Sequence, residues 1–204
     1  MSVSSPSPRC EEVLTLARQL GVLRSRDLAA HGLAREHLRR LVQAGHLQQI
    51  ERGFYHLPAV DQSEHSPLVE VAGRVPAGVV CLHSALAFHH LTTQAPREVW
   101  LALERDTYQP RVTWWPLHIV RFSGLAWTFG MQAHQVEGIP IQVYSPAKTV
   151  ADCFKFRYKL GWHVAVEALR ETWRARRATL SELWEAAQVC RVTSVMGPYL
   201  EILG

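Results

Sequence analysis

The chain has 204 residues, of which 48% are hydrophobic and 20% are charged. This balance excludes a wholly disordered chain and fits one compact domain, or a small module joined to a larger one. The formal net charge is +4, and 19 of the 22 basic residues are arginine. Arginine binds phosphate and guanine better than lysine does, which favours a nucleic-acid partner. A genome that prefers arginine codons would produce the same bias.

The charge is unevenly distributed along the chain. Residues 1–58 hold eight basic and five acidic residues, and residues 146–177 hold eight and three. Acidic residues are in excess elsewhere, by seven to five in 59–145 and by three to one in 178–204. Two basic blocks suit a polyanionic partner better than a uniform excess of the same size would.

Several classes of protein do not fit the sequence. The four cysteines are far apart and form no C-x-x-C pair, which argues against a zinc ribbon or a thioredoxin-type site. The N-terminal segment lacks the basic and apolar regions of a signal peptide, and no apolar stretch is long enough to span a bilayer. We therefore expect a cytoplasmic protein with reduced cysteines and no membrane contact.

The first 58 residues carry the pattern of three short helices. The stretch SPSPRCEEVLTLARQLG predicts a serine-capped helix that ends at Gly21, and RSRDLAAHG predicts a second helix capped by Ser25 and ended by Gly32. The stretch LAREHLRRLVQAG predicts a third helix with Gly45 just after its end. We expect its inner face to hold Ala34, Leu38, Leu41 and Val42, its outer face Glu36, Arg39, Arg40 and Gln43, and its flanks Arg35 and His37.

Two strands follow at about 47–50 and 53–57, joined by the turn ERG, in which Gly53 supplies the positive φ of a tight hairpin. Three helices and a hairpin form a winged helix-turn-helix, whose third helix enters the major groove. Acidic Glu36 and Glu51 would weaken DNA binding, and solvated arginines on an ordinary helical bundle are the alternative interpretation. The residues expected to bind DNA here are Arg26, Arg35, Arg39, Arg40, Gln43 and Arg52, through bases or phosphates.

The polar, proline-flanked segment 59–66 is interpreted as a linker between a domain at 1–58 and a larger one at 67–204. The sequence pattern of the second domain predicts a mixed α/β fold. Helical patterns occur in SPLVEVAGRV, LHSALAFHHL, PAKTVADCFKFR, GWHVAVEALRETWRARR and TLSELWEAAQ, and strand patterns in REVWLALE, LHIVRFS and IPIQVYS. Ser145 is a predicted cap, and Thr179 with Glu182 a predicted capping box. The predicted inner face of the helix from 162 holds Trp162, Ala165, Val166, Leu169 and Trp173.

Two motifs of the second domain invite a chemical interpretation. The stretch CLHSALAFHH (81–90) brings together Cys, Ser and His, but a metal needs three or four converging ligands, and Ser84 lacks a nucleophile elbow, so packing is the favoured role. In SPAKTVAD (145–152), Lys148 at a helix start is a candidate phosphate ligand, and a helix pair with Asp152 is the alternative. We expect no catalytic residue, no metal and no cofactor.

The stretch from Leu20 to Pro58 resembles the N-terminal winged-helix domain of AbiEi-family antitoxins. The shared residues are Gly32-Leu33, Leu41-Val42, Gly45, Leu47, Arg52-Gly53 and Tyr55, and HSALAFHHL and SPAKTVADCFKFR are similar to later family stretches. The resemblance implies a repressor that binds repeats in the promoter of its own toxin–antitoxin operon. It also implies a nucleotidyltransferase-like toxin that is neutralised without a direct complex.

The hypothesis is therefore a sequence-specific transcriptional repressor that binds double-stranded DNA at inverted repeats in its own promoter and acts as an antitoxin. Two alternatives stay open. One is a nucleic-acid-processing enzyme with its active site in 67–204, although its acidic residues form no magnesium motif in the sequence. The other is a protein-interaction module, whose binding would be indifferent to salt.

Overall fold

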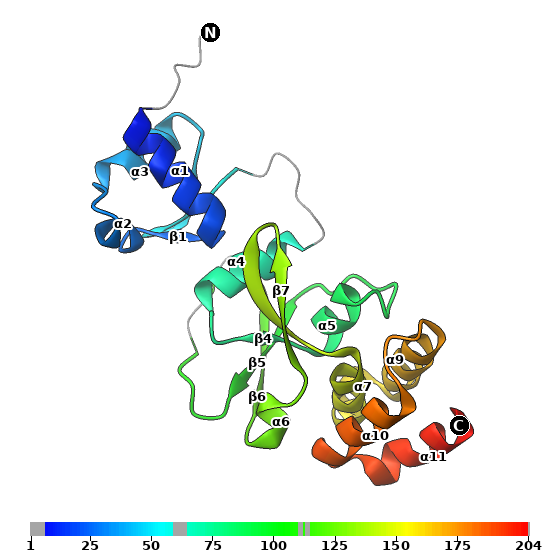
Figure 1. Ribbon diagram of the computed structural model, residues 1–204. Coiled ribbons are helices and arrows are strands. Elements are labelled where there is room, and N and C mark those ends of the chain that lie inside the picture. Colours follow the sequence, from blue (N-terminus) through cyan, green and yellow to red (C-terminus); the bar gives the residue numbers. More distant parts are fainter. Residues whose placement is uncertain (1–6, 59–64, 110–111, 113–114, 204) are drawn as a thin grey trace. The chain divides into compact units, whose positions relative to one another are not determined.

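The structure is a computed structural model that describes residues 7–58, 65–109, 112 and 115–203. It divides into two compact units (Figure 1). The first comprises Met1–Pro76, Pro110–Trp115 and Gln135–Pro140, and the second comprises Ala77–Gln109, Pro116–His134 and Ile141–Gly204. The expected boundary at 59–66 differs from this division, because the helix that begins at Ser66 groups with the first unit; residues 59–64 lie outside the described part.

The first unit contains the predicted three helices and hairpin. Its strands form one sheet in the order β1-β3-β2, with both pairings antiparallel. The short strand β1, between the first two helices, was not predicted. The elements are α1 (Pro8–Leu20), β1 (Leu23–Arg24), α2 (Asp27–Ala30), α3 (Glu36–Gln43), β2 (Gln48–Glu51), β3 (Phe54–His56) and α4 (Ser66–Arg74).

Glycines at positive φ end the two helices of the helix-turn-helix. After α2, Gly32 has φ +64° and its N–H donates to Ala29 O, while Leu33 N–H donates to Leu28 O. The same pair of bonds follows α3, where Gly45 has φ +74°. Both ends are Schellman motifs, which need a residue that tolerates a left-handed backbone. The prediction that Gly45 stands just after the third helix is confirmed.

Two local predictions in this region were wrong. Ser25 does not cap α2; its backbone N–H and hydroxyl both point to Gly53 O, at 2.9 and 3.4 Å. Ala34 is exposed, and Leu33 is buried in its place, since α3 begins only at Glu36. The core of the unit joins α1 to α3 through Val13, Leu16, Ala17, Leu38 and Leu41.

The second unit is built on a five-stranded mixed sheet of order β6-β5-β4-β8-β7, except that the end of β7 and the start of β8 group with the first unit. Strand β4 pairs parallel to β8 and antiparallel to β5, and β5 pairs parallel to β6. The expected mixed α/β class is confirmed. The elements are β4 (Val79–Val80), α5 (Leu82–Phe88), β5 (Val99–Glu104), β6 (Leu117–Phe122), α6 (Leu125–Thr128), β7 (Met131–Val136), β8 (Ile139–Tyr144), α7 (Pro146–Lys155), α8 (Arg157–Leu160), α9 (Trp162–Arg174), α10 (Leu180–Val189) and α11 (Thr193–Leu203).

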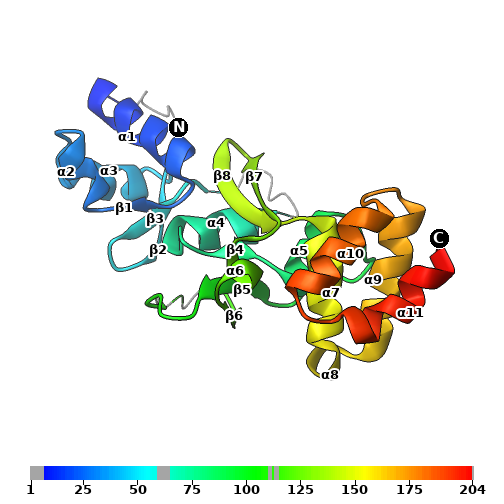
Figure 2. The same ribbon diagram turned by 60° about the horizontal axis from the view of Figure 1, so that its bottom comes forward.

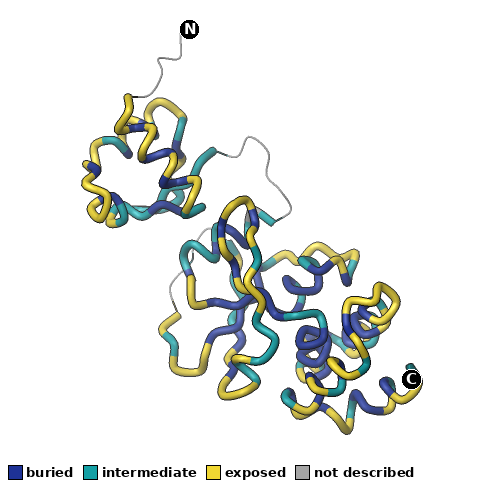
Figure 3. The backbone as a smooth tube through the Cα atoms, in the orientation of Figure 1, coloured by how far each residue is buried: buried dark blue, intermediate teal, exposed yellow. Residues whose placement is uncertain are grey.

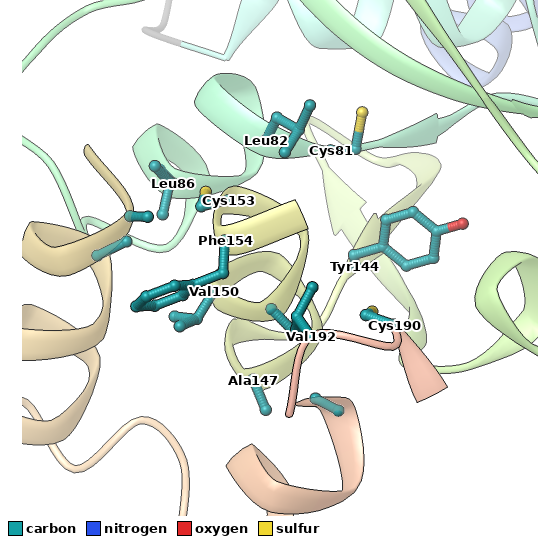
Figure 4. Packing of buried hydrophobic residues seen from close by; sticks show 14 of the residues in the cluster. Cys81, Leu82, Leu86, Tyr144, Ala147, Val150, Cys153, Phe154, Cys190 and Val192 are labelled. Carbon is teal, nitrogen blue, oxygen red and sulfur yellow. The ribbon is translucent and has the colours of Figure 1, made fainter. Parts of the chain in front are cut away.

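Helix α7 lies at the centre of this unit and packs against α5, α9 and α10 (Figure 2). Figure 3 shows it as a continuous buried segment, and residues 147–154 are all buried. Val150, Cys153 and Phe154 project from it into the apolar cluster that Figure 4 shows in detail. The predicted N-cap of α7 is confirmed, because the Ser145 hydroxyl accepts from the Lys148 N–H.

The predicted inner face of α9 is confirmed for Ala165 and Leu169 and was wrong for the two tryptophans. Trp162 and Trp173 are 42% and 37% exposed, whereas the buried residues are Val164, Ala165, Ala168, Leu169 and Thr172. Small side chains at Ala165 and Ala168 let α9 approach α7, and the bulky tryptophans remain at the rim. At α10, by contrast, the predicted capping box of Thr179 and Glu182 is confirmed. In the described residues, no helix is both apolar enough and long enough to cross a membrane.

Candidate nucleic-acid interface

The outer face of α3 carries the residues that were predicted to read DNA. Leu38 and Leu41 point inward and are 2% exposed. Glu36, Arg39, Arg40 and Gln43 are exposed on the opposite side of the helix, and Arg35 lies exposed at its N-cap position. The eight-residue helix, together with its N-cap residue, therefore presents three arginines and a glutamine to solvent.

The arginines of this face differ in their electrostatic environment. Arg40 forms an i,i+4 ion pair with Glu36, and the two side chains are 60% and 65% exposed. Arg39 pairs with no carboxylate among the described residues. A surface ion pair of this kind contributes less than about 1 kcal/mol, so a phosphate can replace Glu36 as the partner of Arg40 at little cost. Glu36 thus neutralises Arg40 and leaves Arg39 uncompensated.

The hairpin of β2 and β3 turns at Arg52-Gly53, where Gly53 has φ +87°. The Ser25 N–H donates to the Gly53 carbonyl, so the turn is tied to the start of α2. Arg26 and Arg52 adjoin the two bonded residues in sequence, and both are exposed. This junction, hereafter the wing turn, therefore brings two of the predicted DNA-binding arginines near each other from points 26 positions apart in the sequence.

Helix α4 contacts the hairpin both beside its turn, through Arg74, and at the far end of β3, through Glu70. The Arg74 guanidinium lies 4.1 Å from the centre of the Phe54 ring and 3.8 Å from a carboxylate oxygen of Glu51. Glu70 accepts from the Trp115 indole at 2.8 Å and lies 3.3 Å from His56 Nδ1. Glu51, expected to oppose DNA binding, is thus matched by a cation. Contacts between residues this far apart in the sequence cannot be predicted from local sequence patterns.

The environment of Glu70 changes its acidity. Burial alone raises the pKa of this carboxyl, but the hydrogen bonds from the His56 ring and the Trp115 indole outweigh burial, and the net pKa is lowered. The ionised form of Glu70 is therefore the one that the His56 ring and the Trp115 indole stabilise.

Comparison with known proteins gives a family for this domain. Residues 11–58 match the family model described as "Transcriptional regulator, AbiEi antitoxin". This domain is of the AbiEi antitoxin family. The match confirms the resemblance over residues 11–58, and it supports a role as a transcriptional regulator or antitoxin. No curated protein matches the chain.

A solved structure extends the similarity beyond the AbiEi domain. The crystal structure of the RV2827C protein from Mycobacterium tuberculosis superposes with a TM-score of 0.62 and covers 97% of this chain and 77% of that one. The sequence identity is 15%, so the comparison shows a shared fold and no more.

Lys148, outside the AbiEi domain, does not fit the predicted contact with phosphate. Its side chain is fully buried and pairs with the equally buried Asp152, four residues along α7. The ammonium group also lies 4.3 Å from the centre of the Phe122 ring and 4.2 Å from that of Tyr144. Burial raises the pKa of Asp152, and the nearby Lys148 opposes that rise. The alternative interpretation, an internal helix pair, is the one that the structure supports.

The cluster at 81–90 has structural roles. The Ser84 hydroxyl accepts from the Trp100 N–H at 2.9 Å, and His89 Nε2 lies 2.7 Å from the Tyr144 carbonyl. His83 packs edge-on against Trp100. Burial lowers the pKa of both histidines. Over the part of the chain that the structure describes, no group of three or more metal-ligating residues occurs.

Proposed function

We propose that the chain is a sequence-specific repressor that binds double-stranded DNA through its AbiEi domain. In this proposal α3 lies in the major groove, and the wing turn contacts the neighbouring phosphate backbone. The observation that carries it is the outer face of α3, where exposed Arg39, Arg40 and Gln43 stand opposite a fully packed apolar stripe. The family match at residues 11–58 supports the same role.

In this proposal the residues of α3 and of the wing turn make different contacts with DNA. Arg39 and Gln43 are both exposed on the outer face of α3, where arginine can recognise guanine and glutamine can recognise adenine. Arg40 exchanges Glu36 for a phosphate on binding, and Arg35 lies at the flank of the same helix. Arg26 and Arg52 at the wing turn contact phosphates, which fix the register of the domain without reading sequence.

The two anchors of the hairpin support binding by pre-organisation. Ser25 fixes the wing turn to α2, and α4 fixes the strands through Arg74 and Glu70. A hairpin held at both ends loses little freedom when it meets DNA, so more of the contact energy appears as affinity.

We further propose that the DNA is an inverted repeat in the promoter of the protein's own operon, where occupancy blocks transcription. The chain would act there as the antitoxin to a nucleotidyltransferase-like toxin, without forming a direct complex with it. The family description supports the regulator and antitoxin roles, and the promoter and the toxin are parts of the proposal.

The test is fluorescence anisotropy with the DNA upstream of the gene and a shuffled duplex of equal composition, at two salt concentrations. The native duplex should bind at least about 10³-fold more tightly, and binding should weaken steeply as salt rises. The Arg52→Ala variant should weaken both duplexes to a similar extent and reduce the salt dependence by about one phosphate contact. Equal affinity for both duplexes would contradict specific recognition.

A further inference from the structure

A short segment of the second unit alternates aromatic and basic residues. Residues 154–163 read FKFRYKLGWH, with three cations and four aromatic residues, and no acidic residue occurs between Cys153 and Val166. The segment covers the end of α7, all of α8 and the start of α9. The AbiEi domain and its DNA-binding face account for none of these residues.

Trp162 is a rigid aromatic platform at the surface. Its side chain is 42% exposed, although its ring packs edge-on against Phe154 at 5.9 Å and tilted against Tyr199 of α11 at 6.0 Å. The indole N–H donates to the Tyr199 hydroxyl at 3.2 Å. Since this polar atom is already satisfied, the exposed part of the ring has only its apolar surface to offer a partner.

A second aromatic ring and a fixed cation stand beside this platform. Tyr158 is 86% exposed, an unusual position for a large aromatic side chain. The Arg157 guanidinium lies 4.4 Å from the Tyr158 ring centre and 5.8 Å from that of Trp162. It also donates to the Phe154 carbonyl at 2.9 Å, which holds it in place between the two rings. Arg157 is half-buried, and Lys159 adds a second cation that is exposed.

We propose that these four residues, Arg157, Tyr158, Lys159 and Trp162, form an aromatic–basic patch that binds single-stranded nucleic acid. Unpaired bases would stack on the exposed rings, and the arginine and lysine would pair with the phosphates between them. Every base has a flat face, so the patch would tolerate many sequences. Within a duplex those faces are covered by neighbouring base pairs, which separates this site from the duplex-reading face of α3.

Charge and ring geometry favour this partner over an acidic protein segment. Such a segment would satisfy Arg157 and Lys159, but acidic side chains leave the two exposed rings without a matching flat surface. An oligonucleotide supplies both features at a regular spacing. The partner is therefore an unpaired stretch of RNA or DNA, and the RNA and DNA probes below distinguish the two sources.

The experiment measures anisotropy of fluorescein-labelled oligouridylate and oligothymidylate, each about 12 nucleotides long, which is within the known range of single-strand site sizes. The full chain should bind at least one of them with a Kd of about 10⁻⁶ to 10⁻⁴ M. Tyr158→Ala should weaken binding by about fivefold or more, and Tyr158→Phe should keep it, because stacking needs the ring and not the hydroxyl. Tyr108→Ala, which removes a tyrosine that is 81% exposed elsewhere in the unit, should leave binding unchanged.

The arginines of α3 also attract polyanions, so each Tyr158 variant is measured with and without Arg39→Ala/Arg40→Ala. The effect of Tyr158→Ala on the oligonucleotide should persist in both backgrounds, and its effect on the operator duplex should be absent. Failure of operator binding alone would leave this proposal intact. Equal oligonucleotide affinity for wild type and Tyr158→Ala would overturn it. The proposal would also be overturned if Tyr158→Ala weakened the binding of labelled polyglutamate as much as it weakened the binding of the oligonucleotide. The patch would then recognise an acidic polypeptide.

Discussion

Replacing Lys148 with methionine is expected to destabilise the second unit strongly. The side chains of Lys148 and Asp152 are both fully buried, so the ammonium is the charge that compensates the carboxylate in the core. Methionine fills a similar volume without the charge. The variant therefore leaves Asp152 buried without its ion-pair partner, and the Cys190 thiol, 3.4 Å from Oδ1, remains as a donor.

The magnitude follows from the cost of breaking a buried pair, about 3–5 kcal/mol in free energy of unfolding at pH 7. Loss of the cation contacts with the rings of Phe122 and Tyr144 adds to this cost. The pKa of Asp152 is already raised by burial, and removal of Lys148 raises it further. An acid whose folded pKa exceeds its unfolded pKa destabilises the fold at pH values above the unfolded pKa. The loss of stability caused by Lys148→Met should therefore shrink as the pH falls.

The assay is urea unfolding at pH 7 and pH 5, followed by circular dichroism. Lys148→Met/Asp152→Asn should recover about 2 kcal/mol or more relative to the single variant, because the uncompensated charge is gone. Lys159→Met, the same change at an exposed lysine, should stay within about 0.5 kcal/mol of wild type. A loss below about 1 kcal/mol for Lys148→Met would refute the reasoning that the pair is buried and coupled.

Three further changes test other parts of the structure. Gly130→Ala should cost more stability than Gly124→Ala, as measured by thermal melts. Both glycines have positive φ, but a Cβ at 130 would lie 2.7 Å from the Lys148 Cβ, whereas a Cβ at 124 would face open space. Equal losses of stability would disprove the close contact. Glu70 has a pKa below its ordinary value of 4.5, so it stabilises the fold above that pH and loses this effect as the pH falls through its folded pKa; acid titrations should show a steeper loss for wild type than for Glu70→Gln, and parallel curves would contradict it. Thr179→Ala should lower the free energy of unfolding by about 1 kcal/mol through loss of the capping box, as measured by urea unfolding. An unchanged free energy of unfolding would show that the cap does not stabilise the fold.

The sequence was most informative where local rules decide the structure. The inner leucines of α3 and the glycines after α2 and α3 were readable because helix periodicity and left-handed caps depend on neighbouring residues alone. The two tryptophans of α9 were misplaced because side-chain size at the α7 contact, rather than hydrophobicity, selects the buried residues. Helix α11 was not predicted, since Pro198 lies inside it and its single charged residue, Glu201, leaves no amphipathic pattern.

Long-range pairings set the limit of prediction for the candidate site. The exposed residues of α3 and the turn at Arg52-Gly53 were predicted, but the contacts that hold the hairpin to Ser25 and to α4 were not. Ser25 was read as a helix cap because its partner, Gly53, is 28 residues away. Lys148 lies at a helix start, where a phosphate ligand and an internal ion pair leave the same sequence pattern, and only its burial separates the two.

We propose above all that the outer face of α3 reads DNA sequence. The most direct measurement is the ratio of native to shuffled duplex affinity for Arg39→Ala/Arg40→Ala, beside Arg9→Ala/Arg18→Ala on α1. Each double variant removes two exposed helix arginines, one of them ion-paired, so the change in charge is matched. We predict that the α3 variant loses most of the specificity ratio and that the α1 variant keeps it. Retention of the full ratio by the α3 variant would contradict the claim.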